Sequence, residues 1–365
     1  MALLDFFTLL GWVLIPILVL ITAINLFTVR LIKEGSWKAI DASVALLIPM
    51  RNEADNVEGL LDSLLKQEGI SHLSINILDD NSTDETASKL ALNIDERMRV
   101  FPGGELPKGW LGKNYACHQL AAQSTADFLV FIDADVRLNR SAIAASISEM
   151  QRLNLDYLSP YPRQIAMTWL ERLVQPLLQW SWFVSVPLRF AERFPRASFA
   201  VANGQFFIVR RSAYEKCGGH SAVRSEVLDD LELARALIRS GARGTVADGS
   251  AVAECRMYRS ARELIAGYSK SQWRAFGTIA GATFMAIVLI ATSITPLIAG
   301  ILGSPWGWIG FFAIVATRLA VAARTRSVIS TAWLHPLSAI AWIFLIKYSW
   351  LNKWRGTLVW KERAL

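Results

Sequence analysis

Two aspartates that follow a short apolar run could bind a divalent cation. Residues 128–132 are all apolar, and Asp133 and Asp135 come directly after them. Such a run is typical of a strand that is buried on both faces, as in a parallel sheet. Two carboxylates at this spacing offer the oxygen ligands that Mg²⁺ and Mn²⁺ prefer. Because an Asp-x-Asp pair taken alone is more often a solvated loop, its interpretation depends on its neighbours.

Two other predicted strands end in polar residues in the same way. Residues 43–50 precede Asn52 and Glu53, and residues 74–78 precede Asp80. A helical repeat of apolar residues separates the two runs, and alternating strands and helices predict a parallel sheet. Ligands of such sheets bind at the carboxyl ends of the strands. The side chains expected to meet at this edge are Asn52, Asp80, Asp133 and Asp135.

A loop between the second and third of these strands suits a diphosphate group. Residues 106–114 read Leu-Pro-Lys-Gly-Trp-Leu-Gly-Lys-Asn. Gly109 and Gly112 permit close approach of the backbone, and Lys113 supplies a cation near the predicted start of a helix. The spacing differs from that of a P-loop, and an ordinary glycine turn with a solvated lysine is the alternative.

The composition is that of a membrane protein with one water-soluble domain. Of the 365 residues, 53% are hydrophobic, and they concentrate near the start and in the last quarter of the chain. Residues 6–29 form an apolar run that is long enough to cross a bilayer. Because a basic start and a cleavage site are missing, we expect an uncleaved anchor rather than a signal peptide. Further apolar runs cover residues 279–302, 308–323 and 329–346.

The charges indicate which partners to expect. The net charge of +7 suits an anionic membrane surface, whereas the dispersed lysines and arginines argue against nucleic acid as a partner. Arg30, Lys33 and Lys38 follow the first apolar run, so the positive-inside rule places the next domain in the cytoplasm. Four spans would then put the basic carboxyl-terminal tail outside, which leaves open whether one run is re-entrant at Pro296 or Pro336.

Residues 163–196 combine tryptophans with arginines and contain Pro176 and Pro187. Charges this frequent argue against a membrane span. We therefore expect an amphipathic helix at the membrane surface, with an aromatic face that includes Trp180 and Trp182 among the lipid headgroups. A helix in the core of the protein is the alternative.

Taken together, these stretches resemble membrane family 2 glycosyltransferases with a GT-A nucleotide-sugar-binding domain. The resemblance covers about residues 44–258. Within the family, the chain is similar to enzymes that glucosylate lipids, namely the ceramide, carotenoid and hopanoid-associated glycosyltransferases. The matching stretches are residues 48–53, 79–84, 106–113, 133–135, 203–206, 218–220 and 229–230.

The resemblance implies a role for each matching position. Asp80 would contact the nucleotide, Asp133 would hold the metal and the ribose, and Asp135 would bind Mg²⁺ or Mn²⁺ directly. Asp230 would be the general base, although the chain has Asp229 where the family has a glutamate. These two aspartates could also begin a helix, which is compatible with that role. The other residues implied in nucleotide-sugar binding are Pro49, Asn52, Glu53, Lys113, Asn203, Gly204, His220 and Asp229.

The resemblance also implies a reaction, the inverting transfer of one sugar from a nucleotide-sugar donor, expected to be a UDP-sugar, to a membrane lipid hydroxyl. Processive members carry Gln-x-x-Arg-Trp, whereas Gln272, Trp273 and Arg274 are consecutive here, so we expect single transfers. The role of Arg274 stays open. One alternative is a polyprenyl-phosphate glycosyltransferase. Another is a membrane transport component with a nucleotide-binding cytoplasmic domain, which is disfavoured because the carboxyl-terminal apolar runs contain no acidic residue.

The expected fold class is an α/β, Rossmann-like GT-A domain with an amino-terminal transmembrane helix and carboxyl-terminal transmembrane helices. We expect a multi-pass protein of the cell membrane whose catalytic domain is cytoplasmic. The predicted parts are an anchor (residues 1–30), the GT-A domain (40–260, with the interfacial segment 163–196), a membrane-surface linker (261–278), a transmembrane region (279–350) and a basic tail (351–365).

Overall fold

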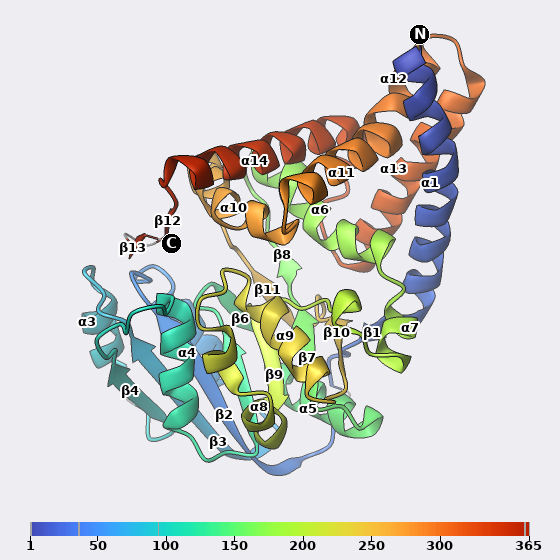
Figure 1. Ribbon diagram of the computed structural model, residues 1–365. Helices are drawn as coiled ribbons and strands as arrows, with labels where there is room; N and C mark the ends of the chain where they lie inside the picture. Colours follow the sequence, from blue (N-terminus) through green and yellow to red (C-terminus); the bar gives the residue numbers. More distant parts are fainter. Residues whose placement is uncertain (1, 36, 94, 361–362, 365) are drawn as a thin grey trace. The chain divides into compact units, whose positions relative to one another are not determined.

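The computed structural model describes residues 2–35, 37–93, 95–360 and 363–364 of the chain (Figure 1). The chain divides into two compact units. The first, called the α/β unit here, comprises Arg30–Arg163 and Phe190–Met257. The second, called the helical unit, comprises Met1–Val29, Gln164–Arg189 and Tyr258–Leu365.

A sheet of eight strands forms the centre of the α/β unit, in the order β1-β10-β7-β9-β5-β2-β3-β4. Neighbouring strands run parallel except for β9, which is antiparallel to β5 and β7. The predicted α/β fold is therefore confirmed. The strands are β1 Arg30–Leu31, β2 Ile40–Met50, β3 Ile70–Asp79, β4 Met98–Pro102, β5 Phe128–Ile132, β7 Tyr157–Tyr161, β9 Phe206–Arg210 and β10 Gly244–Asp248.

Helices cover both faces of this sheet because successive residues of a strand point to opposite sides. In β2, Leu46 packs in the core that contains residues of α2 and α5, whereas Leu47 packs in the core that contains residues of α4 and α9. Burial on both faces explains why the strands are continuous apolar runs in the sequence. The helices are α2 Val57–Leu65, α3 Thr86–Ala91, α4 Gly112–Ala122, α5 Ala142–Leu153, α8 Arg211–Lys216 and α9 Asp229–Arg239, with the 3₁₀ turns η1 Ala197–Phe199 and η2 Gly219–Val223.

Four short elements complete the description of this part of the chain. Strands β6 (Val136–Leu138) and β11 (Ala253–Cys255) form an antiparallel pair that follows the end of β5. Strand β8 (Arg163–Gln164) and helix α7 (Leu188–Arg193) lie where the chain passes from one unit to the other.

Four helical stretches of the helical unit are long and apolar enough to cross a membrane, as far as the described residues show: Leu4–Thr28, Ile279–Ile301, Pro305–Arg324 and Ala332–Arg355. They coincide with the apolar runs of the sequence. A π-helical turn precedes Pro296, and Pro336 lies in the first turn of a helix. The elements are α1 Ala2–Thr28, α6 Trp169–Ser185, α10 Ala261–Ala275, α11 Ile279–Leu289, the π turn η3 Ile290–Ile294, α12 Thr295–Ile301, α13 Pro305–Arg324, η4 Ala332–Leu334, α14 His335–Arg355, β12 Val359–Trp360 and β13 Arg363–Ala364.

Helix α6 lies within the segment that we expected at the membrane surface, and its aromatic residues are placed differently from that prediction. Trp180 and Trp182 are only 4% and 6% exposed, and the helix contacts α1, α13 and α14. The indole Nε1 of Trp180 donates to Thr317 Oγ1 at 2.9 Å. The prediction that these tryptophans face the headgroups is wrong, because apolar residues on several sides of α6 pack against several helices.

Polar groups of the helical unit bind carbonyl groups of α6 next to the proline inside this helix. Pro176 has no N–H, so the carbonyl group four residues earlier loses its helical partner. Thr331 Oγ1 donates to that oxygen, on Arg172, at 2.6 Å. Arg318 Nη2 donates to the next carbonyl, on Leu173, at 3.1 Å. Arg318 also contacts His335, so a structural role accounts for the ionisable residues that the sequence shows inside apolar runs.

Candidate active site

The loops that follow β2 and β3 are joined by hydrogen bonds at the predicted edge of the sheet. Asn52 lies in the left-handed region, with φ at 51°, and its Oδ1 accepts from Thr83 N at 2.8 Å. Asp80 is buried, and its backbone N donates to Met50 O at 2.8 Å. A Cβ on Gly103 would lie 2.9 Å from the Cα of Asp80, so only glycine permits this approach. The side chain of Asn52 therefore shapes the rim of the site.

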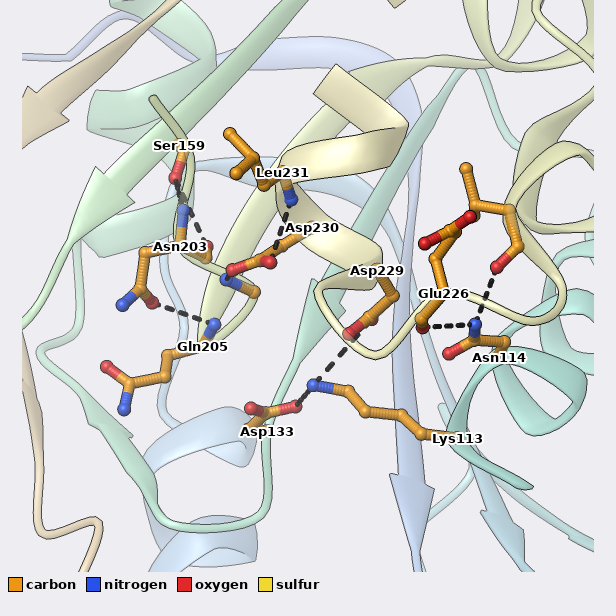
Figure 2. A network of polar contacts seen from close by, with 12 residues as sticks. Lys113, Asn114, Asp133, Ser159, Asn203, Gln205, Glu226, Asp229, Asp230 and Leu231 are labelled. Carbon is orange, nitrogen blue, oxygen red and sulfur yellow. Dashed lines mark hydrogen bonds and ion pairs between the residues drawn. The ribbon is translucent and has the colours of Figure 1, made fainter. Parts of the chain in front are cut away.

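Lys113 occupies the centre of the site, in the first turn of α4. Its ammonium group lies 2.7 Å from Asp133 Oδ1 and 4.0 Å from Asp229 Oδ2 (Figure 2). Burial would lower the pKa of Lys113, but the charges of Asp133 and Asp229 outweigh that effect and raise it well above its ordinary value. The lysine is therefore a cation between two carboxylates, which places it where a diphosphate could compete for it.

Asp230, in the first turn of α9, is held by two backbone N–H groups. Its Oδ2 accepts from Gly204 N and its Oδ1 from Leu231 N, each at 2.7 Å (Figure 2). Burial and the charge of Asp229 raise the pKa of Asp230 to about 6, while Lys113 and the two hydrogen bonds act in the opposite direction. A carboxylate with such a pKa is ionised at neutral pH and still basic enough to accept a proton.

A turn at residues 203–205 brings Gly204 to Asp230. Asn203 Oδ1 accepts from Gln205 N at 2.9 Å, and Asn203 N donates to Ser159 Oγ at 2.8 Å (Figure 2). A Cβ on Gly204 would lie 3.1 Å from Asp230 Cβ, so the close approach requires glycine. The side chain of Asn203 thus has a structural role in the turn, and Gly204 supplies the N–H group that orients the carboxylate.

Asp135 has the chemistry of a cation ligand. Its Oδ1 is buried without a hydrogen-bond partner among the described residues. Burial, Asp133 and Glu53 raise the pKa of Asp135 to about 6. No group of three or more His, Cys, Asp and Glu residues is arranged for a metal in the part of the chain that the structure describes. Two aspartates are nevertheless a fitting donor set for Mg²⁺ or Mn²⁺, which take their other ligands from water and substrate phosphates.

A small pocket at this edge collects most of the predicted residues. The pKa of the buried His220 is lowered to about 3, by burial and then by Lys113, so its ring is neutral. The predicted site residues that line the pocket are Pro49, Lys113, Asp133, Gly204, His220, Asp229 and Asp230. Of the remaining predicted residues, Asn52, Glu53, Asp80, Asp135 and Asn203 do not line it.

Tyr214 is a functional candidate that the sequence analysis missed. Its hydroxyl group accepts from the backbone N of His220 at 3.0 Å and lies 2.8 Å from His220 Nδ1. If the hydroxyl group donates its proton to Nδ1, the neutral imidazole carries its own proton on Nε2. The one indication of this tyrosine in the sequence is the glycine at position 219. This residue has a positive φ, and a Cβ there would lie 2.5 Å from the Tyr214 ring, so the ring requires a glycine beside it.

Comparisons with known proteins agree with this architecture. Residues 45–218 match the model of the family described as glycosyl transferase family 2. The 4,4'-diaponeurosporenoate glycosyltransferase of Staphylococcus haemolyticus (strain JCSC1435) is 27% identical over 233 residues, which are 62% of this chain and 60% of the relative. The protein of the same name from Staphylococcus aureus (strain MRSA252) is 26% identical over 231 residues, with the same shares. The match thus spans about three-fifths of these relatives' length.

A solved structure extends the comparison to the whole fold. Mannosyltransferase PcManGT from Pyrobaculum calidifontis, in complex with GDP-Man and Mn²⁺, aligns with a TM-score of 0.58 over 99% of both chains. Since the two sequences are 17% identical, this likeness concerns the fold alone. It confirms the GT-A-like arrangement of an α/β sheet that we expected from the sequence.

Proposed function

We propose, because residues 45–218 match the model of glycosyl transferase family 2, that the protein is an inverting glycosyltransferase of a membrane. It transfers one sugar from a nucleotide-sugar donor, with UDP-sugars the first to test, to a hydroxyl group of a membrane lipid. The observation that carries the proposal is the geometry of Asp230. Two backbone N–H groups fix this carboxylate beside Lys113 and Asp133, where a base and a diphosphate site are both needed.

The reaction assigns different tasks to the residues of the pocket. The acceptor oxygen attacks the anomeric carbon, the bond from that carbon to the diphosphate oxygen breaks, and the electron pair leaves with the diphosphate. Asp230 takes the proton of the acceptor hydroxyl group. Lys113 binds the diphosphate, which carries more negative charge as it departs. This displacement inverts the anomeric configuration.

A divalent cation bound by Asp133 and Asp135 would neutralise charge on the leaving diphosphate. Two observations support this assignment, namely the unpartnered Asp135 Oδ1 and the Mn²⁺ in the complex of PcManGT. Asp80 and Glu53, at the ends of neighbouring strands, are the proposed contacts of the nucleotide. His220 presents a neutral Nε2–H, which is suited to a sugar hydroxyl group.

The lipid acceptor and the location are supported by the helical unit. Four candidate spans are compatible with a multi-pass protein of the cell membrane, and the relatives named above, whose name describes transfer to an apolar carotenoid acid, support an apolar lipid as the acceptor. The basic residues that follow the first span favour a cytoplasmic catalytic domain. The proposed parts of the chain are therefore the anchor, the GT-A domain, the membrane-surface linker, the transmembrane region and the basic tail, with the bounds expected from the sequence.

The test is transfer to extracted lipid. Membranes that contain the protein are incubated with a panel of labelled nucleotide sugars, and Asp230→Asn membranes serve as the matched control. The expected product partitions into organic solvent, carries one glycosyl unit and resists both mild acid and mild alkali. A product cleaved by mild acid would indicate a glycosyl phosphate, and one cleaved by mild alkali a glycosyl ester. A water-soluble oligosaccharide or a long polymer would contradict the proposal.

A further inference from the structure

Residues 190–196 form an exposed surface of aromatic and basic side chains, called the α7 patch here. Phe190 and Phe194 are each 50% exposed, and their ring centroids lie 4.9 Å apart. The other large apolar side chains that the described α/β unit exposes are Leu92, which directly follows α3, and Val100 on β4. Two adjacent exposed phenylalanines are unfavourable in water, so the α7 patch has the character of a contact surface.

The charge of the α7 patch is positive. Arg193 and Arg196 are exposed and make no ion pair with any residue that the structure describes. The guanidinium group of Arg193 lies 5.9 Å from the centre of the Phe194 ring. The acidic residue of the segment, Glu192, is already paired with Arg30 at 2.7 Å. An anionic partner would therefore meet two available cations next to two aromatic rings.

Helix α7 begins in the helical unit, at Leu188, and that residue is fixed to the end of the first candidate span. Asn25, in the last turn of α1, accepts from Leu188 N at 3.0 Å through its Oδ1. Its Nδ2 donates to Val186 O at 2.7 Å. The bidentate ion pair between Arg30 and Glu192 joins the residues that follow. If α1 crosses a bilayer, Leu188 lies close to the level where the hydrocarbon ends and the headgroups begin, and the α7 patch starts two residues further along the chain.

We propose that the α7 patch inserts into an anionic phospholipid surface. Phe190 and Phe194 enter the headgroup–acyl boundary, and Arg193 and Arg196 bind lipid phosphate groups. Contact with anionic lipid complements both the charge and the apolar character of this surface, and the cytoplasmic leaflet offers such lipids. The proposal rests on the membrane span that is part of the proposed function. It replaces Trp180 and Trp182, which are buried, as the site of surface contact.

The experiment measures depth in the full-length protein, reconstituted in nanodiscs. A nitroxide is attached at Phe194→Cys in a Cys217→Ser background, since Cys117 and Cys255 are buried. The reference is Leu92→Cys, at a position that is 82% exposed. In nanodiscs with phosphatidylglycerol, oxygen should relax the nitroxide at position 194 more strongly than a water-soluble nickel chelate does. At position 92 the nickel chelate should relax the nitroxide more strongly than oxygen does. Equal accessibility at both positions would overturn the proposal.

The arginines provide a second measurement. Each arginine is expected to raise the ratio of inserted to free label about 5-fold. The double variant Arg193→Gln, Arg196→Gln should therefore lower this ratio about 30-fold. Nanodiscs that contain phosphatidylcholine alone should lower this ratio by a similar factor for the protein that keeps both arginines. Dipolar coupling between labels would show that a second copy covers the α7 patch, and would overturn the proposal. These measurements do not depend on sugar transfer. A failure of the proposed membrane contact can therefore be distinguished from a failure of the proposed transferase activity.

Discussion

Replacing Asp230 with asparagine should slow sugar transfer and, at neutral pH, stabilise the fold. Burial and the charge of Asp229 raise the pKa of Asp230 from 3.8 to about 6. One pKa unit corresponds to about 1.4 kcal/mol, so ionisation of this carboxylate at neutral pH costs the folded state at most about 3 kcal/mol. The side chain is partly exposed, which lowers this value. Asparagine removes the cost and keeps an oxygen that can accept from Gly204 N.

The pH dependence of this effect has a definite sign. Since the pKa of Asp230 is higher in the folded chain than in the unfolded one, the folded state binds the proton more tightly. The resulting stability is fully present below about pH 4 and is lost as the pH rises through about 6. The asparagine variant does not titrate. Its advantage in stability should therefore be absent below about pH 4 and largest above about pH 6.

The assay combines stability with turnover. Thermal unfolding of the detergent-solubilised protein is followed by tryptophan fluorescence over this pH range, and sugar transfer is measured on extracted lipid. Loss of a general base typically lowers the rate by about 10²–10⁴-fold, while nucleotide binding should change little.

Asp127 provides a control of opposite sign. Hydrogen bonds from the Ser43 side chain and backbone lower the pKa of Asp127, so its ionised form stabilises the fold above the unfolded pKa and this stability is lost on acidification. Asp127→Asn should therefore lower the unfolding temperature at neutral pH. An Asp230→Asn protein that is no more stable than the original at neutral pH would refute the electrostatic reasoning. Retained activity, together with an inactive Asp229→Asn protein, would place the base one residue earlier.

Three further predictions concern the metal, the imidazole and helix α6. Asp135→Asn should abolish turnover without loss of stability, and full activity in excess chelator would contradict the metal assignment. Tyr214→Phe should raise the KM for the donor about 5-fold, as expected for one lost hydrogen bond, and ¹⁵N NMR should show mixed tautomers of His220. An unchanged tautomer would contradict the role of the tyrosine. Trp180→Glu should prevent folding, as judged by size-exclusion chromatography, whereas Trp169→Glu at an exposed position should be tolerated; a folded Trp180→Glu protein would contradict the core packing of α6.

The residues at the strand ends could be predicted because their signal is local. A buried strand such as β5 is a continuous apolar run, and Asp133 follows directly from where that run ends. The antiparallel direction of β9 could not be foreseen in this way. The chain leaves the α/β unit between β7 and β9, so no crossover helix sets the direction of the returning strand.

Roles that depend on tertiary contacts could not be predicted from the sequence. Asn52 and Asn203 match positions implied in substrate binding, yet the side-chain oxygen of each accepts a backbone N–H and shapes a loop. An asparagine is suited to either task, so its type alone does not distinguish them. The tryptophans of α6 gave the same ambiguity, because aromatic residues favour both a membrane surface and a core. Tyr214 carried no signal of its own, since its importance comes from the imidazole beside it.

The charges of the candidate site explain why cation and donor should bind together. Lys113 lies between Asp133 and Asp229, and Asp230 and Asp135 both have raised pKa values because burial and neighbouring carboxylates disfavour their ionised forms. A diphosphate that entered alone would add negative charge to this group of carboxylates and would compete with them for one lysine. A divalent cation bound by Asp133 and Asp135 would offset that charge and would give the unpartnered oxygen of Asp135 a partner. Nucleotide affinity should therefore depend on the cation even when no acceptor is present, because the repulsion acts at the binding step.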